Sequence, residues 1–358
     1  MPPQQNNPNT SSNDPLSPPV EVGEPTLPQP PISPRKHSPR LILWTLLICL
    51  AALLLVAINR QTIQDWIRLH GYQAPASVAQ LGDQDTMTST GRKLLYINKP
   101  DIADKAVFSQ NCLNKDAEQT IVLGCYHSVE NGIFLLHVTD PRLSGVEQVT
   151  AAHEMLHAAY DRLSNSERTK VDAMLMDYYN HDLKDPRIKN EIALYKKTEP
   201  NDVVNEMHSV FGTEVANLPV GLEQYYSRYF TNRAVVVNFA NNYQAAFTSR
   251  QAEVAQDDSQ LQGLKSQIGS DEADLKAKLT VINTQTQSLR VLRVTDQAGY
   301  NAAVLGYNQL VDQYNNEVAT VKTLVSQYNQ LVTDRNNIAL QEQQLSNALN
   351  ANVQQVNQ

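Results

Sequence analysis

The sequence predicts an α+β protein in which a small antiparallel sheet precedes a mainly helical domain. Short runs rich in β-branched and aromatic residues between positions 93 and 138 indicate the strands. Apolar residues at steps of three and four from Val146 to Leu163 indicate an amphipathic helix. Because the same spacing recurs over most of the last third of the chain, a coiled coil is expected at the carboxyl end.

The amino-terminal 58 residues divide into a polar and an apolar segment. Residues 1–40 hold most of the 18 prolines, with Gln, Asn and Ser beside them, and we expect a disordered tail there. Residues 41–58 then run 18 positions without a charge, and a helix of that length spans about 27 Å, enough for a bilayer core. We therefore expect an uncleaved transmembrane signal anchor. A buried helix of a soluble domain and a cleaved signal peptide are the alternatives, and the long preceding tail disfavours the second.

Charges beside the apolar run predict its orientation. Arg35, Lys36 and Arg40 precede it, whereas only Arg60 and Arg68 follow closely. The positive-inside rule then leaves the tail in the cytoplasm and the rest of the chain outside the cell membrane, as a single-pass protein. The net charge of −8 and the lack of a long basic run elsewhere argue against a nucleic-acid partner.

Cysteine usage is typical of an exported domain. Cys49 falls in the apolar run, which leaves Cys112 and Cys125 as a pair in the part expected outside. Disulfides persist in oxidising compartments, so we predict a bond between these two. Free buried thiols and metal binding by these cysteines are the alternatives.

The segment before the amphipathic helix is expected to contain the sheet. Residues 59–90 should continue the anchor helix to Leu69 and then form a linker, with a folded domain over 91–235. Strands are predicted at 93–98, 121–128 and 133–138. The Asn131-Gly132 dipeptide is a hairpin signal, so the last two strands should pair in the antiparallel sense.

The amphipathic helix contains the motif His153-Glu154-x-x-His157. Positions i and i+4 lie on one helix face, so both imidazoles can reach a single metal ion. Glu154 then lies beside the open metal position, where it can take a proton from bound water. The alternative is a core helix with two partly buried histidines, although such a helix has no need of this order of residues.

A third ligand is expected from one of the helices predicted at about 165–181, 186–197 and 200–211, the last ending at Gly212. A hydrolytic zinc site uses three protein ligands and one water. The segment Asn205-Glu206-x-x-Ser209 resembles the N-E-x-x-S segment of the thermolysin-like gluzincins, whose glutamate completes a His2Glu site. This resemblance implies a zincin-like fold, with Glu206 as the third ligand. Metzincins have a third histidine at the position that Leu163 occupies here, so the sequence excludes the metzincin type of zinc site.

The resemblance is partial, because Val210 stands where the family has an aspartate that orients a zinc histidine. Asp161 is our candidate for that outer carboxylate, with Glu214 after it. The third ligand itself also has alternatives, which are His208, Glu214, His181 and Glu191.

Catalytic roles follow from the motif and the resemblance. Glu154 would be the general base, and a second donor near the developing oxyanion is expected from His208 or Tyr160. Weaker candidates for this donor are Tyr225, Tyr226 and Arg228. In the family, the strand before the metal helix commonly binds an extended substrate by strand addition.

Residues 236–358 are expected to form a coiled-coil arm. One apolar run spans 261–292, a second resumes at Val304, and Thr295-Asp296-Gln297-Ala298-Gly299 breaks the pattern between them. Two runs with a break predict an antiparallel helical hairpin. The alternative is one continuous helix that associates with a second chain.

The sequence as a whole predicts a membrane-anchored, extracytoplasmic zinc metalloendopeptidase that binds one Zn²⁺. Its substrate would be a peptide or protein, cell-wall cross-link peptides included. The alternative is a surface scaffold in which the coiled coil is the functional part and the zinc site is structural or vestigial. Glu154 disfavours the scaffold, because a structural site has no use for a base.

Overall fold

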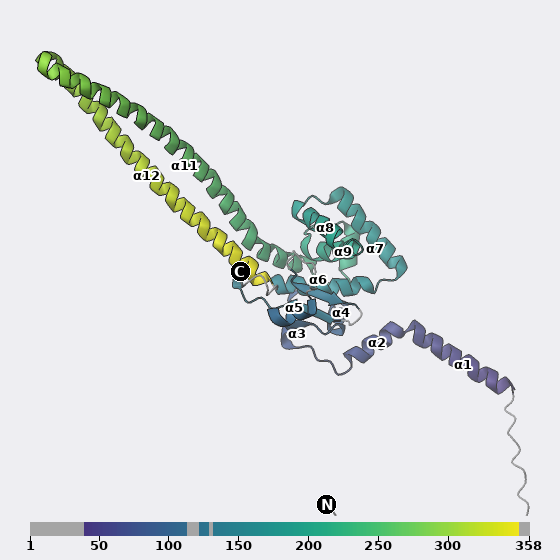
Figure 1. Cartoon of the computed structure of the whole chain (residues 1–358). Helices are drawn as coiled ribbons and strands as arrows, with labels where there is room; N and C mark the ends of the chain where they lie inside the picture. Colours follow the sequence, from purple (N-terminus) through teal and green to yellow (C-terminus); the bar gives the residue numbers. More distant parts are fainter. Residues whose placement is uncertain (1–38, 113–121, 129–131, 351–358) are drawn as a thin grey trace, which may run out of the picture. The chain divides into compact units, whose positions relative to one another are not determined.

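The computed structural model describes residues 39–112, 122–128 and 132–350 (Figure 1). Residues 1–38 of the tail predicted over 1–40, and residues 129–131 of the predicted turn, lie outside these ranges. The chain divides into two units, residues 1–63 and residues 64–358.

In the first unit, helix α1 (Pro39–Ile58) is apolar along its length and most of its large side chains are exposed. Helix α2 (Arg60–Leu69) begins in this unit and continues into the second. Among the described residues, no single helix is long and apolar enough to cross a membrane alone, while Leu43–Ile58 and α2 meet that requirement as a pair. The membrane span therefore stays a prediction.

The second unit begins with helices where the sequence suggested a linker and a strand. Helix α3 (Ala76–Gln84) buries Val78 and Leu81 in the main core, so the linker prediction is wrong for this part of 59–90. Helix α4 (Ser89–Ile97) occupies the strand predicted at 93–98. The hydroxyl of Thr88 caps it by accepting a hydrogen bond from the backbone N–H of Gly91. A short apolar run fits the residue repeat of a strand and that of a helix equally well. Here the cap favours the helix.

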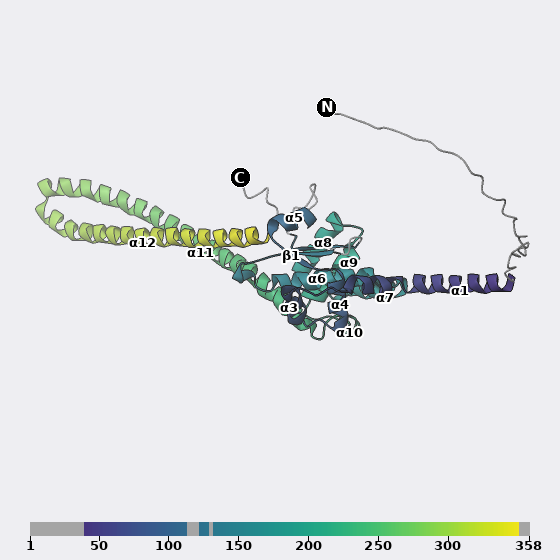
Figure 2. The same ribbon diagram turned by 90° about the horizontal axis from the view of Figure 1, so that it is seen from below.

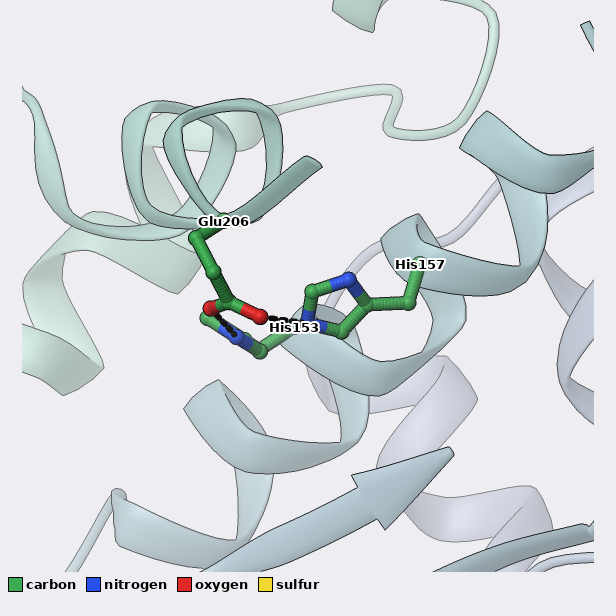
Figure 3. Close-up of side chains that lie close together, drawn as sticks. All are labelled: His153, His157 and Glu206. Carbon is green, nitrogen blue, oxygen red and sulfur yellow. Dashed lines mark ion pairs between the residues drawn. The ribbon is translucent and has the colours of Figure 1, made fainter. Parts of the chain in front are cut away.

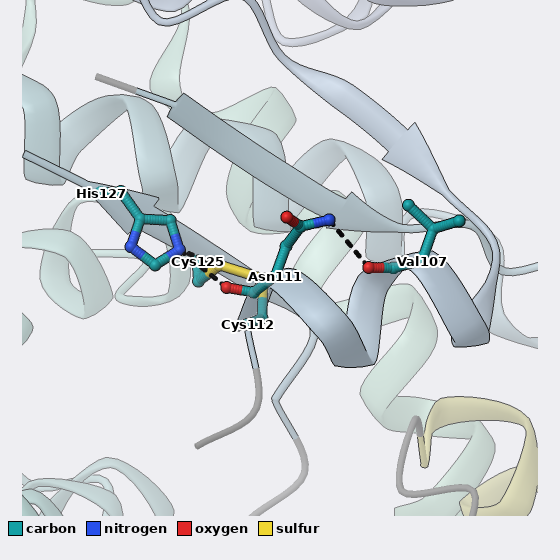
Figure 4. The surroundings of a disulfide bond; sticks show 5 residues. All are labelled: Val107, Asn111, Cys112, Cys125 and His127. Carbon is teal, nitrogen blue, oxygen red and sulfur yellow. Dashed lines mark hydrogen bonds between the residues drawn. A yellow bond between two sulfur atoms is a disulfide. The ribbon is translucent and has the colours of Figure 1, made fainter. Parts of the chain in front are cut away.

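The sheet has three strands in the order β1-β3-β2. Strands β2 (Gly124–His127) and β3 (Gly132–Leu136) pair antiparallel, as predicted from the hairpin signal. Strand β1 (Asp101–Ala103) pairs with β3 in parallel, so the sheet is mixed rather than antiparallel. Helix α5 (Lys105–Cys112) makes the connection after β1, and the predicted Cys112–Cys125 disulfide joins its end to β2 (Figure 4).

The metal-motif helix α6 (Val146–Asp161) lies at the centre of the second unit, after the short 3-10 helix η1 (Pro141–Leu143). Helices α3, α4, α9 and α11 and strands β2 and β3 all contact it. The remaining elements of the helical part are α7 (Asn165–Asp177), the π-helical turn η2 (Tyr178–Asp182), α8 (Pro186–Thr198), α9 (Val203–Glu214) and α10 (Val220–Tyr226). The predicted helices at 165–181, 186–197 and 200–211 thus form, within a few residues of their expected ends.

The arm is an antiparallel hairpin of two long helices, α11 (Arg233–Thr295) and α12 (Gln297–Leu349), which lie side by side in Figures 1 and 2. Asp296 separates them, and its carboxylate accepts a hydrogen bond from the backbone N–H of Gly299. The hairpin, and not a continuous helix, is therefore the form that the chain adopts. At the end of α12, Leu345 and Leu349 pack on Leu143 of η1 and on Val146 at the start of α6.

Candidate metal centre

Three ligand side chains from two helices meet in the second unit. His153 and His157 lie one turn apart on α6, with ring centroids 4.7 Å apart, and Glu206 faces them from α9. Oε2 of Glu206 lies 3.5 Å from Nε2 of His153, and Oε1 lies 3.4 Å from Nε2 of His157 (Figure 3). The third ligand predicted from the sequence is therefore the one that the structure places beside the histidines.

The group is suited to a metal ion. Its ligand atoms lie within 4.8 Å of one another, and each side chain is at most 15% exposed. Burying a carboxylate between two imidazoles costs free energy unless the charges are balanced, and a bound cation supplies that balance. Two imidazoles and one carboxylate are ligands that Zn²⁺ accepts. The described residues thus contain a buried His-His-Glu group that can hold one metal ion.

The approach of α9 to α6 depends on a glycine. A Cβ on Gly212 would lie 2.4 Å from Cδ1 of Leu156 and 2.8 Å from Cε1 of Tyr226. Gly212 was expected to cap α9, but the helix continues to Glu214 and the glycine lies at its contact with α6. The missing side chain lets α9 pack closely against α6 nearly two turns past Glu206.

His157 is oriented by a residue of α9. Its Nδ1 lies 3.0 Å from Oδ1 of Asn205, which leaves Nε2 facing Glu206. Asp161, which we expected in this role, is exposed and instead interacts with the hydroxyl of Tyr126. On His157, therefore, an amide oxygen holds the position that we expected the Asp161 carboxylate to take.

Glu214, the second candidate for the outer carboxylate, is hydrogen-bonded to residues of α8 and α11. Oε2 of Glu214 accepts hydrogen bonds from Nη1 of Arg187 and Nε2 of Gln244, both at 2.6 Å. This contact links α8 and α9 to the base of α11. Glu214 thus serves the packing of three helices.

Glu154 is buried next to the metal group, with 5% of its surface exposed. Burial raises the pKa of its carboxyl to about 8, although His157 lowers it and Glu206 raises it further. Strand β2 covers this carboxyl closely, because a Cβ on Gly124 would lie 2.6 Å from Oε1 of Glu154. The glycine leaves the space in which the Glu154 side chain lies.

Tyr195 is a site residue that the sequence reasoning missed. Burial raises the pKa of the Glu206 carboxyl, but His157, His153 and a hydrogen bond from Tyr195 outweigh that effect and the pKa is lowered. Burial also raises the pKa of the Tyr195 hydroxyl. Tyr195 follows buried Ile188 and Ile192 on one stripe of α8, and this spacing could have placed it on the inner face.

The two residues expected to stabilise the oxyanion are engaged elsewhere. The Tyr160 hydroxyl donates to Oδ1 of Asp172 at 2.7 Å, and the residue is 6% exposed. His208 is fully buried, with Nε2 2.8 Å from the Tyr225 hydroxyl, and burial lowers its pKa well below the usual range. Each of these groups thus has a partner outside the three candidate ligands, and a role at the oxyanion stays a prediction for both.

The remaining candidates also lie outside the metal group. The hydroxyl of Tyr226 donates to the His208 carbonyl, and Arg228 pairs with Glu167 at the surface. His181 is exposed on η2, and Glu191 pairs with Arg187 at 3.3 Å. Among these candidates, Glu206 is the residue that lies with His153 and His157 in a group that could hold a metal ion.

Comparisons with protein-family models, with curated proteins and with solved structures find no match. The metal centre therefore rests on the geometry of its own residues.

Proposed function

We propose that the protein is a zinc-dependent metallopeptidase that hydrolyses peptide bonds. The observation that carries the proposal is the His153, His157 and Glu206 group with Glu154 buried beside it. A bound Zn²⁺ would supply an activated water and a positive charge that polarises the scissile carbonyl. Proton transfer and hydrogen bonding to the substrate would be carried out by side chains of the protein itself.

Glu154 is suited to move the proton. It belongs to the same helix turn as His153 but is not one of the three candidate ligands, so its carboxyl, in the ionised form, is available as a base. It would take the proton of the attacking water and return it to the nitrogen of the leaving amine. Gly124 of β2 lies close to its carboxyl, which limits its motion and excludes water from that side. Tyr195, whose hydroxyl hydrogen-bonds Glu206, is a candidate for a donor to the substrate carbonyl.

Strand β2 supports a peptide as the substrate. It pairs with β3 on one side, and the described residues contain no strand on its other side. An extended peptide can add to such an edge through backbone hydrogen bonds. Gly124 on this strand lies against Glu154, so a peptide paired with β2 would pass the base.

The site is proposed to act outside the cytoplasm, on a chain held to the membrane by residues 41–58. The disulfide between Cys112 and Cys125 supports an oxidising compartment. The charge distribution around the apolar run supports the same orientation.

The scaffold alternative draws support from the long hairpin of α11 and α12. A structural zinc site, however, closes with a fourth protein ligand. Among the described residues the metal group has three, which favours a site with one position open to water.

The experiment measures bound zinc and hydrolysis of unfolded casein for the full chain. Glu154→Gln should keep zinc and lose at least about 100-fold in rate, because the base is removed and the ligands stay. Glu147→Gln is the matched control on the same helix and should keep both. Wild-type hydrolysis by Glu154→Gln, or a wild-type chain that binds no zinc, would overturn the proposal.

A further inference from the structure

Exposed apolar side chains gather at the distal end of the arm. We define the arm tip as residues 279–311, which surround the break between α11 and α12. Val294 is 86% exposed, Leu305 66% and Val291 62%. Leu279 and Val281 at the base of the tip are also exposed, whereas the described rest of the arm exposes only two large hydrophobic side chains, Val325 and Leu340 on α12.

These side chains are not needed to hold the hairpin together. The two helices meet through other residues, such as Ile282, which is buried, and Thr286, whose hydroxyl donates to the Tyr307 hydroxyl at 3.1 Å. Val291 and Val294 are directed to solvent instead. Outward positions elsewhere on the arm are mostly Gln, Asn and charged residues, so the solvated valines indicate a surface that is covered by something else.

The charges of the tip have one prevailing sign. Between Lys278 and Asp312 the charged residues are Arg290, Arg293 and Asp296. Both arginines are exposed, while Asp296 caps α12 through Gly299. A chain with a net charge of −8 therefore presents a positive end on its arm.

We propose that the arm tip docks on an anionic lipid surface. Valine and leucine side chains would enter the boundary between headgroups and acyl chains, and Arg290 and Arg293 would contact lipid phosphates. The tip is the closed end of a hairpin, and a bilayer accepts such a convex end without a matching groove. A second copy of the chain fits less well, because two tips would bring like-charged arginines together. This inference does not depend on the metal centre.

The test places a fluorescent probe at the tip of the full chain. Cys49→Ser removes the free thiol, and Ala302→Cys then carries an environment-sensitive dye beside the exposed valines and Leu305 without replacing them. The matched position is Ala273→Cys, which is exposed midway along α11. Because each dye reports its own surroundings, the readout is independent of how residues 41–58 interact with lipid.

The chain is combined with vesicles of phosphatidylcholine alone or with added phosphatidylglycerol, and quenching by a lipid-borne quencher is measured. The dye at position 302 should be quenched in anionic vesicles, and the dye at 273 should not. Arg290→Gln with Arg293→Gln should weaken tip binding by about 30-fold, roughly 5-fold per arginine. The control Lys265→Gln with Lys276→Gln removes equal charge from the arm and should change little.

Three results would overturn the proposal. The first is an unquenched dye at 302 in anionic vesicles. The second is equal quenching in both kinds of vesicle, which would remove the role of charge. The third is a change at 302 that follows protein density and not lipid composition, which would identify the tip as a contact between copies or with another protein.

Discussion

Gly124→Ala tests the proposed base without altering a metal ligand. The added Cβ would lie 2.6 Å from Oε1 and 2.9 Å from Cγ of Glu154, and 2.5 Å from Cγ2 of Thr150. Ordinary contacts begin at 3.4 Å, so the carboxyl must move by about 0.8 Å, the difference between 3.4 and 2.6 Å. A misplacement of about 1 Å can lower a catalysed rate by roughly 100-fold.

The folded state should survive this change. Overpacking a tight site costs about 1–3 kcal/mol of unfolding free energy, less than the stability of an ordinary domain. His153, His157 and Glu206 keep their positions, so zinc affinity should stay near that of the wild type. The expected signature is a protein that folds and binds zinc but hydrolyses casein about 100-fold more slowly.

The assay compares casein hydrolysis, bound zinc and melting temperature for Gly124→Ala and a control. Gly263→Ala is the control, because its Cβ would meet nothing within 4 Å on the exposed side of α11. It should leave rate and zinc unchanged. The reasoning is refuted if Gly124→Ala hydrolyses casein at the wild-type rate, or if its loss of activity follows a loss of zinc.

Three further predictions concern the metal group and the disulfide. Glu206→Ala should lower zinc affinity by at least about 10- to 100-fold in a chelator competition. His208→Ala should keep zinc and lower the free energy of unfolding in urea by about 1–3 kcal/mol. If His208→Ala loses zinc and Glu206→Ala keeps it, the assignment of Glu206 as the ligand is contradicted. Asn205→Ala should weaken zinc binding by about 10- to 100-fold, because the His157 ring loses its orienting contact, and unchanged affinity would show that packing alone orients it. Cys112→Ser with Cys125→Ser should lower the free energy of unfolding by about 3 kcal/mol, and an unchanged urea midpoint would show that the bond does not constrain the unfolded chain.

The parts of the fold predicted correctly from the sequence are long segments in which the apolar positions repeat regularly. Helix α6 and the arm repeat their apolar positions over several turns, so the pattern identifies them without tertiary context. The run at 93–98 has only six residues, and its helix is selected by Thr88 and by packing in the core. Strand β1 has three residues, too few to show alternation, which is why the parallel pair and the mixed sheet were missed.

The residues of the candidate metal group were predictable because their sequence patterns are local. The i and i+4 histidines lie on one face of any helix, and Glu206 was indicated by its own short segment. Asn205 and Tyr195 act through contacts between helices that are distant in sequence. Their roles depend on how α8 and α9 pack against α6, and no residue pattern near the motif encodes that packing.

Two glycines show how the fold is adapted to the proposed site. Gly212 on α9 and Gly124 on β2 are far apart in the sequence, yet each lies against a residue beside the ligands, Leu156 in one case and Glu154 in the other. The close approach at Gly212 is needed for any site shared by α6 and α9, whether structural or catalytic. The close approach at Gly124 confines a carboxylate that binds no metal in the group. Since a purely structural site gains nothing from a confined and unligated carboxylate, the space at Gly124 favours catalysis over scaffolding.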